Sequence, residues 1–441
     1  MKLFYALIVF ILFHNCSFDN KTGIWKNDNI TLKKQEDAVK GFRTISEMNE
    51  SFNEIINIKK NFNFVETMPI QNFEWTDVFY NQTNNYNNFS YKGLNKAIYK
   101  SKKLSKFKVN DSILFKDNNL IISDEKGNII FYSLNTNQII SKFNFYKKKY
   151  KKIKKKLNLI VDKNIIYVSD NLGYLYALDY QTNKILWAKN YKIPFRSNLK
   201  TSEKNLITSN QNNNLFFFNK NNGDVVKLIP TEESVVKNQF INNISLNNSS
   251  IFFLNTYGTL YSIDSQNLEV NWFLNLNQSF DINPNTLFDS TEIINNKDKI
   301  IVSSNKSIYI IDSKLGSTIY KKNFSSLIKP IIFNDYLFLI SKNNLLVSID
   351  LNNGKIIYSY NINEKIASYL NTKKEKVEFK NLFIINNKIF VFLKNSYLLK
   401  FNINGNLEKI NKLSSKINTQ PIFIEGSIFY VNNKNKLIIV D

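Results

Sequence analysis

The sequence predicts an all-β protein: an eight-bladed β-propeller with four-stranded antiparallel blades, whose ring is closed by an N-terminal strand. Three observations predict this fold. A unit of strands and turns recurs eight times from about residue 94 onward. The strands are short and rich in β-branched and aromatic residues, with turn residues between them. The chain also ends where the last unit still lacks a strand. We therefore expect residues 71–441 to form the propeller.

The spacing of the repeat identifies its type. In each unit one strand ends in Asp or Asn, and successive ends lie 38–52 residues apart. This interval is typical of a propeller blade and differs from the periods of helical repeats. The eight strand ends are Asn135, Asp179, Asn219, Asp264, Asp312, Asp350, Asn402 and Asp441.

Two recurring residue types have structural explanations. A short carboxylate at a strand end can accept hydrogen bonds from backbone amides two residues on, which predicts turn-opening roles for Asp179, Asp264, Asp312 and Asp350. Eight residues after each of them stands a large aromatic side chain: Trp187, Trp272, Tyr320 and Tyr358. We expect these rings to pack between neighbouring blades, each contributing about 1.5–3 kcal/mol. The alternative is a ring of aromatic ligand-binding residues.

The turn after each strand end favours residues that tolerate a positive φ. Four residues after the strand end stand Gly223, Gly316 and Gly354, and Asn183 occupies the same place in another copy. Leu268 departs from this pattern.

The repeat predicts how the ring closes. The last unit stops at Asp441 without a fourth strand, whereas Asn95–Lys100 matches the fourth-strand stretch Asn183–Ala188 and places Tyr99 at the aromatic position. A strand from the start of the body would thus complete the last blade and remove two exposed sheet edges.

The N-terminus predicts export and a lipid anchor. Met1-Lys2 precedes the apolar run Leu3–Phe13, which is too short to span a bilayer and is typical of a signal peptide, here residues 1–15. Cys16, the single cysteine, follows at once and resembles a bacterial lipoprotein processing site, although Phe13 and Asn15 depart from the usual lipobox. The alternative is a free thiol in a signal peptide or membrane anchor. Residues 16–70 are polar and predict a tether.

The charge is strongly basic. Lys and Arg number 59 against 36 Asp and Glu, a net charge of +23, which favours anionic partners. Codon bias in an AT-rich genome would produce the same excess of Lys and Asn, so net charge alone does not select a partner. One cluster exceeds this background: a candidate basic contact loop at Lys147, Lys148, Lys149, Lys151, Lys152, Lys154, Lys155 and Lys156. It could meet anionic lipid or an acidic partner; the alternative is an ordinary solvated loop.

The repeat L-Y-x-[LI]-D-x-x-[TN]-G-x-x-x-[WY] over residues 95–441 resembles that of the pyrroloquinoline-quinone-like (PQQ-like) propellers. With the expected lipid anchor, the chain resembles the BamB family of outer-membrane lipoproteins. Lys40–Arg43 and Phe73–Trp75 also resemble the segment before the first blade in that family. The resemblance implies a non-catalytic scaffold at the periplasmic face of the outer membrane. Its implied partners are the barrel-forming assembly subunit and unfolded barrel precursors, with no nucleic acid and no cofactor.

Enzymes with the same repeat are the main rival interpretation. Quinoprotein dehydrogenases resemble this chain but hold their quinone between a tryptophan and a vicinal disulfide, and a chain with one cysteine cannot form that disulfide. His14 is the single histidine and would leave with the signal peptide, which removes the commonest general base. We expect no catalytic residue and no metal site. The alternatives are a quinone- or calcium-dependent oxidoreductase and a sugar- or peptide-binding propeller.

Overall fold

The computed structural model describes residues 17–18, 25–26, 52–233, 243–277, 287–373 and 375–441. The chain divides into two compact units, Met1–Glu50 and Ser51–Asp441. In the first unit, β1 (Ser17–Phe18) pairs in antiparallel orientation with β2 (Trp25–Lys26). The expected signal peptide, Cys16 and Lys40–Arg43 lie outside the described residues.

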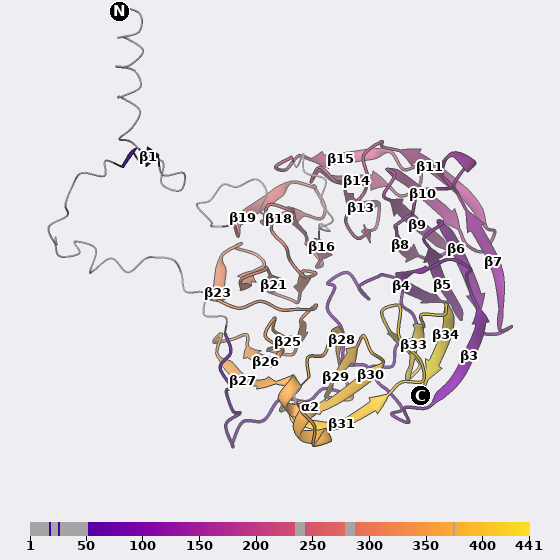
Figure 1. Ribbon diagram of the computed structural model, residues 1–441. Helices are drawn as coiled ribbons and strands as arrows, with labels where there is room; N and C mark the ends of the chain where they lie inside the picture. Colours follow the sequence, from indigo (N-terminus) through magenta and orange to yellow (C-terminus); the bar gives the residue numbers. More distant parts are fainter. Residues whose placement is uncertain (1–16, 19–24, 27–51, 234–242, 278–286, 374) are drawn as a thin grey trace, which may run out of the picture. The chain divides into compact units, whose positions relative to one another are not determined.

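The second unit is a ring of eight four-stranded antiparallel sheets, which confirms the predicted eight-bladed propeller (Figure 1). The first strands of blades 1 to 7 contact one another in series, so the first strand of each blade is the innermost. The chain then runs outward through each blade and returns to the centre to start the next.

The strands of blades 1 to 4 have the following bounds. Blade 1 contains β4 (Val109–Lys116), β5 (Asn119–Asp124), β6 (Asn128–Ser133) and β7 (Gln138–Asn144). Blade 2 contains β8 (Leu157–Asp162), β9 (Ile165–Asp170), β10 (Tyr174–Asp179) and β11 (Lys184–Asn190). Blade 3 contains β12 (Lys200–Thr201), β13 (Asn205–Ser209), β14 (Leu215–Asn219) and β15 (Val225–Ile229). Blade 4 contains β16 (Asn243–Leu246), β17 (Ser250–Leu254), β18 (Thr259–Asp264) and β19 (Val270–Asn275).

Blades 5 to 8 complete the ring. Blade 5 contains β20 (Ile294–Asn295), β21 (Lys299–Ser303), β22 (Ile308–Asp312) and β23 (Thr318–Lys322). Blade 6 contains β24 (Ile331–Phe333), β25 (Tyr336–Ile340), β26 (Leu345–Asp350) and β27 (Ile356–Asn361). Blade 7 contains β28 (Phe379–Ile385), β29 (Lys388–Leu393), β30 (Tyr397–Asn402) and β31 (Leu407–Lys412). Blade 8 contains β32 (Ile422–Ile424), β33 (Ser427–Val431), β34 (Lys436–Val440) and β3 (Ala97–Lys103).

Burial follows the position of a strand within its blade. Every residue of β6 and β33 is buried, whereas most residues of the outer strands β7 and β11 are exposed. Neighbouring blades stack face to face, so the central strands are covered on both sides. This explains why the sequence there reads as continuous apolar runs and not as alternation of apolar and polar residues.

The predicted closure of the ring is confirmed. β3 pairs with β34 in antiparallel orientation, and Tyr99 lies opposite Ile439. The amides and carbonyls of Lys96 and Asp441 exchange two hydrogen bonds of 3.0 Å beyond the end of this pair. Blade 8 therefore contains three strands from the end of the chain and one from before blade 1.

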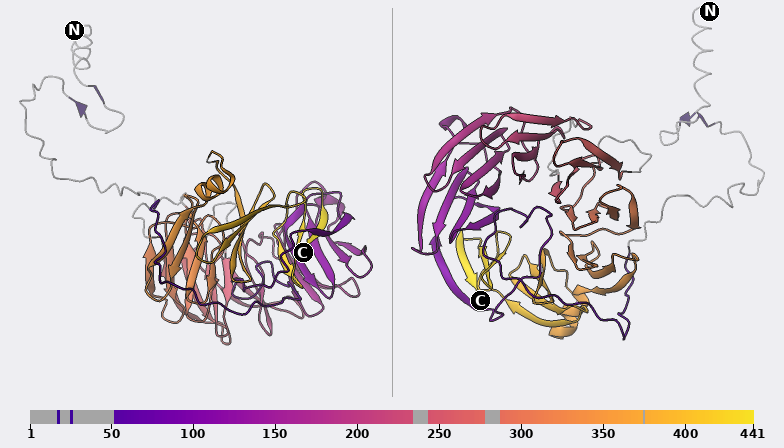
Figure 2. Two further views of the ribbon diagram at one scale, coloured as in Figure 1. Left: turned by 90° about the horizontal axis from the view of Figure 1, so that it is seen from below. Right: turned by 180° about the vertical axis from the view of Figure 1, so that it is seen from behind.

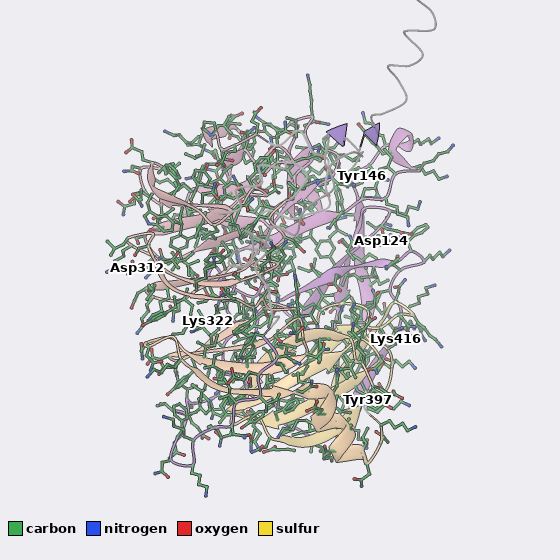
Figure 3. All side chains as sticks on the ribbon, turned by 60° about the vertical axis from the view of Figure 1, so that its left-hand side comes forward. Asp124, Tyr146, Asp312, Lys322, Tyr397 and Lys416 are labelled. Carbon is green, nitrogen blue, oxygen red and sulfur yellow. The ribbon has the colours of Figure 1, made fainter. Side chains whose placement is uncertain are left out.

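The ring has two faces that differ in their connections. The face with the loops between blades and the turns between second and third strands is called the loop face; the opposite face, with the remaining turns, is called the turn face. Asp124 and Tyr146 belong to the loop face, and Figure 3 shows them away from Asp312, which opens a turn of the turn face. The helix α2 (Ile362–Leu370), capped by the Asn361 side chain, follows β27 and projects from the loop face (Figure 2, left). No helix among the described residues is both long and apolar enough to span a membrane.

Candidate functional site

The chain before blade 1 makes one lap inside the ring. Residues 72–89, called the inner segment, reach the first strand of each blade in ring order near the turn face (Figure 2, right). Starting with blade 8 and continuing from blade 1 to blade 7, the inner segment hydrogen-bonds to Phe423, Phe115, Val161, Thr201, Leu246, Asn295, Ile332 and Ile384. These bonds pair backbone groups that would otherwise line an open channel.

The approach to the inner segment also belongs to the body. Ile56 exchanges backbone hydrogen bonds of 3.1 and 2.9 Å with Ser359 on the outer edge of β27, and the Phe64 ring contacts Tyr336 at 4.8 Å between centroids. The sequence-based boundary placed the tether at residues 16–70, but residues 52–70 pack against the propeller. Apolar residues spaced along this otherwise polar stretch are the reason, since they cover blade 6.

An aromatic cluster on the inner segment fills the centre of the ring at the turn face. Trp75 and Phe89 are completely buried, and Tyr86 is nearly so. The Tyr86 ring stacks on Phe383 at 4.5 Å between centroids, and the Phe89 ring stacks on Phe423 at 5.5 Å. These rings join the cores of blades 7 and 8 to a segment that is not part of any blade.

A buried ion pair connects the inner segment to blade 3. Lys200 Nζ lies 2.6 Å from Asp77 Oδ2 and donates to the carbonyl of Asn81 at 2.6 Å, while both charged side chains are almost completely buried. Burial lowers the pKa of Lys200, and the Asp77 carboxylate partly offsets that effect. The pair thus depends on both partners being present.

A second buried lysine lies beside the inner segment. Lys329 Nζ donates to the Asn84 carbonyl at 2.8 Å and lies 3.1 Å from the centroid of the Tyr86 ring. Burial lowers the pKa of Lys329 well below its usual range and raises the pKa of the Tyr86 hydroxyl. Neither the two lysines nor the inner segment has a repeat pattern, so the sequence predicted neither of them beyond the resemblance noted at Phe73–Trp75. The signal that could have found them is the density of Asn and aromatic residues between 72 and 89.

A pocket of about 390 Å³ lies in the centre of the ring toward the loop face. Phe79 and Tyr86 of the inner segment contribute to its lining, and its wall includes an ion pair of 2.8 Å between Lys380 and Asp111. Among the described residues that line it there is neither a tryptophan nor a cysteine, so the lining does not fit the quinone site described above. No group of three or more His, Cys, Asp or Glu side chains suited to a metal ion occurs in the described part of the chain.

The four aspartates of the repeat lie at the turn face. The carboxylate oxygens of Asp179, Asp264 and Asp312 each accept hydrogen bonds from the backbone amides two and three residues on, at 2.8–3.1 Å. Asp350 accepts from the amide of Asn352 at 2.8 Å. These bonds lower the pKa of Asp179 and Asp264.

The four aromatic side chains each reach the next blade in the ring. The indole of Trp187 donates to the Lys220 carbonyl at 2.8 Å, and the hydroxyls of Tyr320 and Tyr358 donate to backbone carbonyls at 2.8 and 3.0 Å. Trp272 makes a longer bond of 3.3 Å to Ser313. Each ring therefore lies against a turn of its neighbour.

The turn that receives the ring carries a glycine. A Cβ atom at Gly223 would lie 2.6 Å from the Trp187 ring, and one at Gly316 would lie 2.5 Å from Trp272. A Cβ atom at Gly354 would lie 2.7 Å from the Tyr320 ring. Leu268 occupies this turn position in blade 4 in place of a glycine. A glycine is not required there, because the matching position of the preceding blade is Lys227 and not an aromatic residue. The glycines of the repeat thus serve ring packing as well as a positive φ.

The basic loop lies between β7 and β8 on the loop face and contains the short 3-10 helix η1 (Lys148–Tyr150). Lys155 is buried, and its ammonium group donates to the carbonyl of Tyr150, so it is not a surface residue. Six lysines of the cluster are exposed: Lys147, Lys148, Lys151, Lys152, Lys154 and Lys156. The side chain of Lys149 is not described.

Comparisons with known proteins agree with this architecture. The solved structure of BamB from Moraxella catarrhalis has a TM-score of 0.61 at 13% identity, covering 78% of this chain and 99% of that one. Quinohemoprotein alcohol dehydrogenase from Comamonas testosteroni has a TM-score of 0.58 at 10% identity, covering 83% and 80%. The computationally designed Ika8 protein has a TM-score of 0.55 at 11% identity, covering 77% and 99%. At these identities the likeness shows the fold alone. No curated protein matches the chain significantly.

The fold and the repeat define an eight-bladed propeller of the PQQ-like class. Residues 116–360 match the family model described as "Outer membrane protein assembly factor BamB", and this region is more than half of the chain. The chain therefore belongs to the BamB family.

Proposed function

We propose that this protein is a non-catalytic scaffold of the outer-membrane protein assembly machinery, which binds the barrel-forming subunit and unfolded barrel precursors. The observation that carries the proposal is the family match over residues 116–360. The closed ring supports it, because the inner segment bonds to all eight blades and joins them into one body. Such a body presents its loops and strand edges in fixed positions.

The outer edge of blade 3, which pairs with no strand in the described part of the chain, is suited to an unfolded precursor. β15 ends its sheet, and Val225, Val226 and Leu228 on it are 45%, 52% and 42% exposed. An exposed apolar edge strand is a template for pairing with another extended chain. The protein already uses an outer edge in this way, since Ile56 pairs with Ser359 on β27.

We expect the double substitution Val226→Lys with Leu228→Lys to reduce crosslinking to an unfolded barrel precursor severalfold, because lysines on an edge strand disfavour pairing. The control is Met68→Lys with Leu315→Lys, which places the same charge on residues that are 89% and 76% exposed elsewhere. Photo-crosslinking yield in purified components is the measurement. Equal yields for the two variants would contradict a role for β15.

We further propose that Cys16 carries the lipid and holds the protein at the periplasmic face of the outer membrane. We expect Cys16→Ala to abolish incorporation of labelled fatty acid and to move the protein out of the outer-membrane fraction, because no acyl chain can then be attached. Membrane fractionation and fatty-acid labelling measure both effects. A protein that stays in the membrane fraction unlabelled would show a different anchor.

The proposed function is tested by retrieving the protein from crosslinked, detergent-solubilised outer membrane. We expect the barrel-forming assembly subunit in the eluate. An eluate without that subunit, together with the ultraviolet-visible spectrum of a bound quinone, would support the oxidoreductase alternative instead. A specifically retained sugar or peptide would support a ligand-binding propeller.

A further inference from the structure

The basic loop is held in a defined conformation by contacts with blades 1 and 2. The Tyr146 hydroxyl donates to Asp170 at 2.5 Å, and the Tyr150 and Tyr174 hydroxyls lie 2.9 Å apart. The amide of Lys155 donates to the Glu125 carbonyl at 2.9 Å. The loop is therefore fixed to the second-to-third-strand turns of blades 1 and 2, and its tyrosines and its buried lysine are used for that purpose.

The fixed loop presents a cationic surface with an apolar residue inside it. The Lys154 side chain is 81% exposed even though it pairs with Glu125 at 3.5 Å, and Lys147, Lys148, Lys151 and Lys152 are exposed with no ion pair to a described residue. Ile153, in the middle of the cluster, is 42% exposed. Clustered lysines with an apolar side chain among them match the charge and the interfacial apolar layer of an anionic phospholipid surface.

The described body also begins on the loop face. The Phe52 carbonyl accepts a hydrogen bond of 2.8 Å from Asn343, which lies in the turn between β25 and β26 on that face. The first described residue of the propeller unit thus lies on the same face as the basic loop.

We propose that the basic loop binds an anionic phospholipid surface and turns the loop face of the propeller toward the membrane. The inference is independent of which assembly partner the protein binds. Each lysine close to an anionic bilayer strengthens binding by up to about fivefold, and salt screens the attraction. The exposed lysines together therefore suffice for measurable binding without an acyl chain.

The test uses residues 17–441, which contain every strand of the eight blades, so that no acyl chain contributes. We expect binding to vesicles of phosphatidylcholine with phosphatidylglycerol, and none to phosphatidylcholine alone. Replacing Lys147, Lys148, Lys151 and Lys152 with Ser should weaken that binding at least tenfold at low salt. The control replaces four exposed lysines of the turn face with Ser: Lys163, Lys204, Lys297 and Lys355.

The control carries the same net charge as the loop variant and should bind nearly as the parent does. Equal weakening in both variants would show that net charge alone acts, and would overturn the proposal. The proposal would also be overturned if the parent protein did not bind anionic vesicles. The same holds if these lysines bound nucleic acid or an acidic protein but not vesicles. Unchanged thermal unfolding of both variants verifies that each is folded.

Discussion

Replacing Asp77 with alanine is expected to lower the free energy of unfolding by about 3–5 kcal/mol, because it leaves the Lys200 ammonium group buried without its counter-ion. The Asp77 carboxylate also accepts the amide of Phe79 at 2.8 Å, so a turn of the inner segment is lost as well. Denaturant unfolding followed by tryptophan fluorescence measures the change. The expected effect is large because the inner segment bonds to every blade.

Two further variants separate the ion pair from general damage. The double variant Asp77→Ala with Lys200→Met should be more stable than Asp77→Ala alone, because the Lys200 charge is removed together with its counter-ion. Glu408→Ala breaks a pair with Lys388 whose side chains are about one-third exposed, and should cost at most about 1 kcal/mol. A double variant no more stable than Asp77→Ala would rule out the buried charge as the cause.

The second large effect concerns the glycine that faces Trp272. We expect Gly316→Ala to cost about 3–4 kcal/mol, the sum of a left-handed backbone at φ +69° and a methyl group placed 2.5 Å from the indole ring. Thermal or denaturant unfolding measures the loss. Because the glycine belongs to blade 5 and the tryptophan to blade 4, this substitution acts on the contact between blades.

The chain contains a matched control for the backbone contribution. Gly93 has φ +82°, and a Cβ there would meet nothing within 4 Å, so Gly93→Ala should cost only about 1 kcal/mol. In a Trp272→Ala background the cost of Gly316→Ala should fall toward the same value. Similar losses for Gly316→Ala and Gly93→Ala would show that the ring contact contributes little.

The blades could be predicted because the same pattern of strands and turns occurs eight times in the sequence. The aspartate ends and the aromatic at +8 each recur in several copies, and only the last copy lacks a fourth strand. The fold class and the closure by the stretch around Tyr99 therefore follow from comparing copies. The role of the glycines was predicted only in part. A positive φ is a local property of one turn, whereas the overlap with Trp272 involves a residue from another blade.

The candidate site was less predictable than the fold. The basic loop was visible as eight lysines, but only the packing shows Lys155 turned inward and Tyr146 tied to Asp170. The central pocket and the Lys329 contact with Tyr86 were not visible at all, because they join residues more than 240 positions apart. No repeat pattern marks such a pair.

The sequence by itself determined the number of blades, their strand order and the way the ring closes. These properties depend on the order of strands and turns within each repeat unit, which can be read from a short stretch of sequence. Only the tertiary structure decided the path of residues 52–89, which begin on the loop face, run along the outer edge of β27 and then circle the centre of the ring near the turn face. The physical reason is that most of this path is held by hydrogen bonds to or from backbone groups. Such bonds do not require a periodic pattern of residue types, so the sequence does not reveal them. Where side chains do hold it, as at Asp77 and Lys200, the partners occur once and come together only when the ring is complete.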